Sequence, residues 1–120
     1  MKPNKATGYI QKTKIGILDH SGSMHLAQEL ALAVDYRKDR NVLIDLQQTT
    51  INADIHSLIE TAAECGRLMC DFPRKIAVVI PQCKDEQNRA KRFKACMIMQ
   101  NFRYENFHDR KDAIRWLTTS

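Results

Sequence analysis

A carboxylate and two hydroxyl groups alternate along one short stretch of the chain, at Asp19, Ser21 and Ser23. These side chains offer hard oxygen atoms, which Mg²⁺ prefers as ligands, and Mg²⁺ usually keeps several waters in its octahedral shell. One tight turn could therefore supply part of a magnesium site. The same residues also have a structural use, because Gly22 can make the turn, Ser23 can cap a following helix and Asp19 can accept backbone hydrogen bonds.

The pattern Asp-x-Ser-x-Ser, placed between an apolar run and a helical stretch, resembles the metal-ion-dependent adhesion site of von Willebrand factor A domains. The resemblance implies two further ligands, a Thr from a second loop and an Asp from a third loop that typically reads Thr-Asp-Gly. Here Thr49 and Thr50 follow too soon for the usual topology, and Pro81-Gln82-Cys83 stands at the third position. We therefore expect no tightly held metal at this turn, and no cofactor.

Apolar runs and amphipathic stretches alternate along the chain. Runs rich in Ile, Val and Leu predict strands, whereas apolar residues that recur every three or four positions predict helices. The expected strands span residues 9–18, 42–46, 76–80 and 104–107, and the expected helices span about 24–38, 53–69, 85–101 and 110–117. This order predicts one α/β domain over residues 1–120, with a four-stranded, mostly parallel or mixed sheet and about four helices.

The details of the pattern predict which parts are buried. Val42–Leu46, apart from Asp45, and Ile76–Ile80 are the most continuously apolar runs of the chain, which is typical of central strands covered on both faces. Tyr104–Phe107 is expected at an edge, through which a homodimer could form. The predicted helix caps are Ser23, Asn52 and Asp109. The predicted inward stripes contain Leu26, Leu30, Ala33 and Val34 in the first helix, and Ile55, Leu58, Ile59, Ala62 and Met69 in the second.

Loops rich in polar residues follow three of the expected strands. They are Asp19–Ser23, Gln47–Asn52 and Pro81–Lys84. The carboxyl ends of parallel strands meet at one edge of the sheet, and open α/β sheets tend to bind their ligands there. These three loops are therefore expected to lie together and to carry any binding site.

Three segments, in order and with characteristic spacing, resemble one known family over nearly the whole chain. They are the Val-Leu-Ile-Asp-Leu run at 42–46, the run Lys-Ile-Ala-Val-Val-Ile-Pro at 75–81, and the closing Phe-x-Asp-x-x-x-Ala-x-x-Trp-Leu at 107–117. The chain resembles the STAS-like family, in its SpoIIAA-like branch. This resemblance implies a small α/β domain that binds a regulatory protein partner and has no catalytic activity.

The better-known members of that family, the anti-sigma-factor antagonists, are switched by phosphorylation in a loop that reads roughly Asp-Ser-Ser-Gly-Leu. The matching stretch here, residues 53–57, reads Ala-Asp-Ile-His-Ser and lacks Ser-Ser-Gly. The resemblance therefore implies partner binding without the usual phosphoserine switch. The residues expected to contact the partner are Thr49, Thr50, Asn52, Asp54 and Ser57.

The net charge of +5 arises entirely in the second half of the chain. Residues 1–60 carry seven basic and seven acidic side chains, whereas residues 61–120 carry twelve and seven. The densest basic run contains Arg89, Lys91, Arg92 and Lys94, and it can contact an anionic membrane surface or form a solvated helix face. With nearby Met and Phe residues, it gives the alternative function of an apolar-ligand or membrane-surface module. Nucleic-acid binding would depend on this run alone and is not favoured.

Four cysteines, Cys65, Cys70, Cys83 and Cys96, have no Cys-x-x-Cys spacing. The chain has neither a signal-peptide core nor an apolar run of membrane-spanning length. Reduced thiols and a cytoplasmic location, at most peripheral to a membrane, are therefore expected. Dinucleotide, phosphate-loop and Gly-x-Ser-x-Gly motifs are missing from the sequence, which favours a binding module over an enzyme.

Overall fold

The computed structural model describes residues 8–37 and 39–119, in which four strands alternate with four helices. In chain order they are β1 (Tyr9–Leu18), α1 (His20–Tyr36), β2 (Asn41–Ile51), α2 (Ile55–Leu68), β3 (Lys75–Val79), α3 (Lys84–Met99), β4 (Arg103–Phe107) and α4 (Arg110–Thr118). The strands lie in the order β1-β2-β3-β4, and every neighbouring pair is parallel. The predicted α/β fold is confirmed, with a fully parallel sheet.

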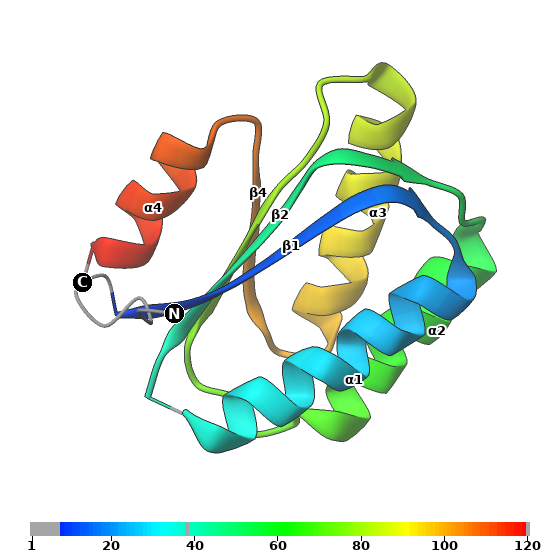
Figure 1. Ribbon diagram of the computed structural model, residues 1–120. Coiled ribbons are helices and arrows are strands. Elements are labelled where there is room, and N and C mark those ends of the chain that lie inside the picture. Colours follow the sequence, from blue (N-terminus) through cyan, green and yellow to red (C-terminus); the bar gives the residue numbers. More distant parts are fainter. Residues whose placement is uncertain (1–7, 38, 120) are drawn as a thin grey trace.

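Helices cover both faces of the sheet, with α1, α2 and α3 on one face and α4 on the other (Figure 1). Crossovers between adjacent parallel strands are right-handed, so successive connections in one direction place α1, α2 and α3 on the same face. The larger apolar core lies beneath them and includes Val42 and Ile44, whereas Leu43 belongs to a smaller core with Ala113 and Leu117 of α4. This alternation explains why consecutive residues of β2, Val42 to Ile44, are all apolar.

The predicted positions of three strands in the sheet are confirmed. The runs Val42–Leu46 and Ile76–Ile80 lie in and directly after the central strands β2 and β3, and nearly all of their side chains are buried. The segment Tyr104–Phe107 lies in the edge strand β4. The two most continuously apolar segments therefore form the strands that are buried on both faces of the sheet.

One strand is longer than the sequence predicts. Instead of ending at Leu46, β2 continues to Ile51, because it pairs with the end of β1 from the Ile15–Gln48 pair onward. Since the last pair between β2 and β3 is Asp45–Val79, residues 15–18 and 48–51 form a two-stranded projection, called here the β1–β2 extension. The expected loop 47–52 is thus mostly strand.

A register shift between Thr13 and Ile15 precedes this extension in β1. Gly16 follows the shift with a φ of +95°, in the left-handed region that glycine adopts readily and other residues rarely adopt. The bulge and the glycine together turn the end of β1 away from the regular sheet.

Two of the three predicted helix caps are wrong. The N-cap of α1 is Asp19, whose Oδ1 accepts a hydrogen bond of 2.8 Å from the Gly22 backbone N–H, so Ser23 lies inside the helix. Similarly, Asp54 rather than Asn52 caps α2, and its Oδ1 accepts from the Ser57 N–H at 2.9 Å. A carboxylate at an N-terminus also interacts favourably with the helix dipole.

The predicted inward stripe of α2 is also partly wrong. The predicted Leu58, Ala62 and Met69 are buried, but Ile55 and Ile59 are 38% and 50% exposed, and the helix buries Ser57, Thr61 and Cys65 as well. In α1 the predicted inward stripe is confirmed, except that Ala27 is buried more fully than Ala33. The rotation of α2 therefore places hydroxyl groups in the core and two isoleucines at the surface.

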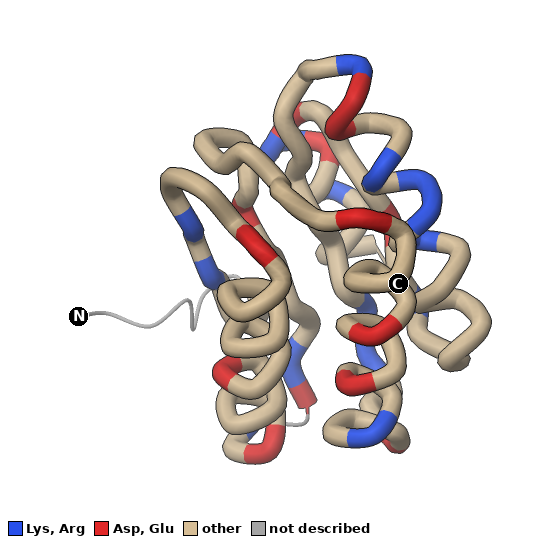
Figure 2. Tube along the Cα trace, turned by 90° about the vertical axis from the view of Figure 1, so that its right-hand side faces the viewer, with Lys and Arg blue, Asp and Glu red and all other residues tan. Residues whose placement is uncertain are grey.

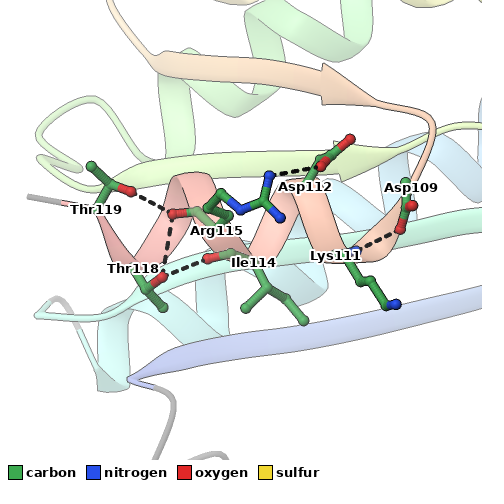
Figure 3. Close-up of polar contacts among 7 residues, drawn as sticks. All are labelled: Asp109, Lys111, Asp112, Ile114, Arg115, Thr118 and Thr119. Atoms are coloured by element: carbon green, nitrogen blue, oxygen red, sulfur yellow. Dashed lines mark hydrogen bonds and ion pairs between the residues drawn. The ribbon is translucent and has the colours of Figure 1, made fainter.

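The last helix, α4, is capped at both ends by its own side chains (Figure 3). Asp109 caps the start as predicted and accepts from the Lys111 N–H at 2.7 Å, while Asp112 pairs with Arg115 instead of completing a capping box. At the other end, the Thr118 hydroxyl donates to the Ile114 carbonyl at 2.9 Å. These local bonds favour a helix of only nine residues.

Replacing the N-cap of α4 should destabilise the fold. Asp109→Ala removes the cap and should lower the free energy of unfolding by about 1 kcal/mol in urea denaturation. Asp112→Ala, three residues later, removes only an exposed ion pair and should change it by less than about 0.5 kcal/mol. Equal effects of the two substitutions would show that the cap has no special role.

Candidate functional site

The predicted metal-binding residues, Asp19, Ser21 and Ser23, lie at the start of α1. The Asp19 carboxylate accepts from the Gly22 N–H, Ser21 is exposed, and Ser23 is partly buried one turn into the helix. Among residues 8–37 and 39–119, no three His, Cys, Asp or Glu side chains gather closely enough to hold a metal ion. The turn thus has the capping geometry that the structural interpretation predicts for Asp19.

The five predicted partner-contacting residues lie at the carboxyl end of the sheet, but only some are accessible. The hydroxyl of the buried Thr49 donates to the Leu46 carbonyl at 2.7 Å, whereas Thr50 and Asn52 are exposed. Asp54 caps α2, and Ser57 is buried in its first turn. Accessible partner contacts are therefore limited to one side of the extension and the start of α2.

A histidine joins the first two helices at this end of the molecule. The His20 Nδ1 atom lies 2.7 Å from the Ser57 Oγ, and its Nε2 lies 3.5 Å from an oxygen of Glu60. His20 and Glu60 are partly exposed, whereas Ser57 is 8% exposed. We call these three residues the α1–α2 junction. Since the serine hydroxyl is buried, the contact between it and the histidine serves to hold the two helices together.

An exposed apolar surface lies elsewhere, between β1 and α1. Five large apolar side chains of the described residues are more than 70% exposed, and Ile15, Ile17, Leu32 and Tyr36 are four of them. The two isoleucines line a groove of about 230 Å³ beside the first turns of α1, and Leu32 and Tyr36 line a second, open groove of about 540 Å³ along the same helix. We call this surface the β1–α1 face.

An ion pair divides the β1–α1 face. Lys14 Nζ donates to a Glu29 carboxylate oxygen at 3.0 Å, and Glu29 lines both grooves. The hydrogen bond from Lys14, and then its charge, lower the pKa of Glu29 below its usual value. The carboxylate therefore stays ionised at neutral pH, and the face presents two apolar patches on either side of a fixed charge pair.

The β1–α1 face was not predicted from the sequence, although the residue patterns that form it are present there. Ile15 and Ile17 alternate in a strand, and Leu32 and Tyr36 lie one turn apart on a helix. Each pair fits a buried stripe as well as an exposed one. Only the position of β1 at the edge of the sheet, with α1 behind it, shows that these side chains remain uncovered.

The predicted basic residues lie in α3, after its acidic first turn, and they are Arg89, Lys91, Arg92 and Lys94. Basic positions gather in the upper right of Figure 2. Two of the four are in ion pairs, since Arg89 lies 3.4 Å from Glu86 and Lys94 lies 2.9 Å from Glu105. Lys91 and Arg92 are exposed and have no ion-pair partner among the described residues. Part of this run is thus a solvated helix face. No described helix has the length and hydrophobicity to cross a membrane.

The four cysteines differ widely in accessibility. Cys65 is buried, and burial, followed by the charge of Glu64, raises the pKa of its thiol to about 12. Cys70 and Cys83 are exposed, and Cys96 is partly buried. Because the thiolate is the reactive form, Cys65 should be chemically inert in the folded protein.

No protein-family profile and no curated protein matches this sequence. Among solved structures, the chain is similar to an uncharacterized protein from the DUF3478 family with a SpoIIAA-like fold, from Shewanella loihica PV-4. The TM-score is 0.60 at 21% sequence identity, and the match covers 91% of this chain and 83% of that one. The chain therefore has the SpoIIAA-like fold that the sequence resemblance predicts.

Labelling with a thiol-specific disulfide reagent should separate the cysteines. Cys70 and Cys83 should react first and Cys96 more slowly, whereas Cys65 should react only after denaturation. Mass spectrometry of peptides taken at successive times would give the order. Labelling of Cys65 in the native protein at the rate of Cys70 would contradict the packing described for α2.

The α1–α2 junction should be measurable as a coupling energy. In a double-mutant cycle of His20→Ala and Ser57→Ala, the hydrogen bond should give a coupling of roughly 0.5–1.5 kcal/mol in the free energy of unfolding. The matched cycle of His20→Ala and Glu60→Ala probes the more exposed contact and should give less than about 0.5 kcal/mol. Additive effects in the first cycle would exclude a stabilising junction.

Proposed function

We propose that this protein is a non-enzymatic binding module whose β1–α1 face binds a regulatory protein partner. The supporting observation is the concentration of four strongly exposed apolar side chains, Ile15, Ile17, Leu32 and Tyr36, on one side of the domain. Contiguous apolar patches on soluble domains mark interaction surfaces, whereas single exposed apolar residues are common.

The backbone of β1 offers a second kind of contact. As the first strand in the sheet order, β1 pairs only with β2 among the described strands, so its other edge has no strand beside it. An extended partner segment can add to such an edge through main-chain hydrogen bonds, while side-chain pockets select its sequence. The 230 Å³ groove beside Ile15 and Ile17 is such a pocket.

Polar features around the face would orient the partner. The Lys14–Glu29 ion pair separates the two apolar patches, and Lys12 and Arg37 line the second groove. Of the residues that the family resemblance implicates, Thr49 lines the first groove and Thr50 pairs with Ile17 in the extension. The proposed surface thus adjoins the predicted one and shifts it toward the edge of the sheet.

Substitution of the exposed isoleucines should abolish partner binding without unfolding the domain. Ile15→Thr/Ile17→Thr keeps residues that favour strands. It should lower the affinity at least tenfold, because buried apolar anchors dominate interface energies. Tyr36→Gln should act in the same direction. The measurement is capture of proteins from the native host on immobilised domain, followed by calorimetric titration of the partner so identified.

Met99→Gln is the matched control, since Met99 is 82% exposed but lies at the end of α3, which packs over β4 rather than beside β1. It should leave partner binding unchanged. Retention of the partner by the isoleucine variant would contradict the proposal. A wild-type dimer in light scattering that becomes monomeric in that variant would instead show that the face binds a second copy of this chain.

A further inference from the structure

A cavity of about 90 Å³ lies inside the larger core, between the sheet and α1, α2 and α3. Its wall is almost entirely apolar, and most of its lining residues are buried. Small side chains face it from each helix, namely Ala27 of α1, Thr61 and Cys65 of α2, and Ala90 of α3. The space is therefore a gap in the packing that three helices share.

The cavity approaches the surface at one place. Only four of its lining residues are partly exposed, and they are Ser23, Ile51, Arg89 and Phe93. They come from the first turns of α1, the end of β2 and the middle of α3, which meet near the carboxyl end of the sheet. An entrance at this end is where open α/β sheets usually take their ligands.

Thr61 gives the cavity one polar group that lacks a partner. It is 6% exposed, and its hydroxyl has no hydrogen-bond partner among the described residues. A buried hydroxyl without a partner is destabilising, and most buried polar groups in folded proteins are hydrogen-bonded. The hydroxyl in the wall is therefore available to form a hydrogen bond with a molecule in the cavity.

Water is a poor candidate for that occupant. A buried water molecule typically makes about three hydrogen bonds, and cavities lined by apolar groups stay dry. Here the cavity is lined by apolar side chains such as Leu30, Ile76 and Met97. A molecule that is mostly apolar and carries one hydrogen-bonding oxygen would match this wall better than water does.

The lining also excludes charged or covalently bound ligands. Burial raises the pKa of Cys65 to about 12 and raises that of Tyr104, so both groups remain protonated and unreactive. Arg89 lies 3.4 Å from the carboxylate of the buried Glu86, whose other oxygen accepts from the Ile51 N–H. That pairing leaves the entrance close to neutral, and moving an ion into the apolar interior would be costly.

We infer that this cavity binds a small, uncharged molecule or chain end of a few carbon atoms that carries one oxygen, which pairs with Thr61. The cavity has room for roughly three water-sized groups at about 30 Å³ each, less than the engineered cavities of about 150 Å³ that hold benzene. Short alcohols and ketones belong to this class. The site is separate from the β1–α1 face, so either proposal can fail alone.

The experiment compares two probes of nearly equal shape, ethanol and propane, by NMR titration of the methyl-labelled protein. Both should shift the methyl signals of Leu30, Ile76 and Val78, which line the cavity. Thr61→Val removes only the hydroxyl and should fold with an unchanged or higher melting temperature. It should weaken ethanol binding roughly three- to tenfold, the effect of one lost hydrogen bond, and leave propane binding unchanged or tighter.

Two further variants locate the effect. Thr118→Val, on the exposed side of α4, should change neither affinity, whereas Ala90→Leu fills the space and should abolish binding of both probes. The inference is overturned if neither probe shifts the lining methyl groups of the wild type. It is equally overturned if Thr61→Val binds ethanol as tightly as the wild type does.

Discussion

A parallel sheet must be covered on both faces, and among the described residues one face of this sheet is covered by α4 alone. The end of that short helix is fixed by two polar residues of the central strands. The buried Lys75 donates from Nζ to the carbonyls of Trp116 and Thr119, and Asn41 Nδ2 donates to the Leu117 carbonyl. A cation at a helix C-terminus interacts favourably with its dipole. The ammonium is thus buried with partners, and α4 stays seated on the sheet.

The sequence predicted those parts of the fold that local patterns determine. The runs Val42–Leu46 and Ile76–Ile80 read correctly as central strands, because apolar side chains on both faces leave few alternatives. The segment 47–51 was not predicted as a strand, because its polar residues form one only by pairing with the end of β1, far away in sequence. Strand formation depends more on such context than helix formation does.

The cap of α1 and the buried side of α2 were not predicted correctly, for a related reason. Asp19 and Ser23 are both good capping residues, and the choice between them depends on where β1 ends. The stripes of α2 also compete, and packing against α1 buries Ser57, which then meets His20. That rotation exposes Ile59, which a sequence pattern assigns to the core. Neither the capping residue of α1 nor the buried side of α2 can be predicted from the residues of that helix alone.

The cavity persists because contacts around it hold the helices in place. A core gap normally shrinks when neighbouring elements move inward, and the cost of a cavity depends on how well the site can collapse. Here His20 ties α1 to α2 through Ser57, and Glu86 of α3 accepts a hydrogen bond from the Ile51 N–H at the end of β2. An inward shift of α1 or α2 would strain the first of these bonds, and an inward shift of α3 would strain the second. Since α1 also forms one wall of the β1–α1 face, the same polar contacts position both the internal cavity and the external surface.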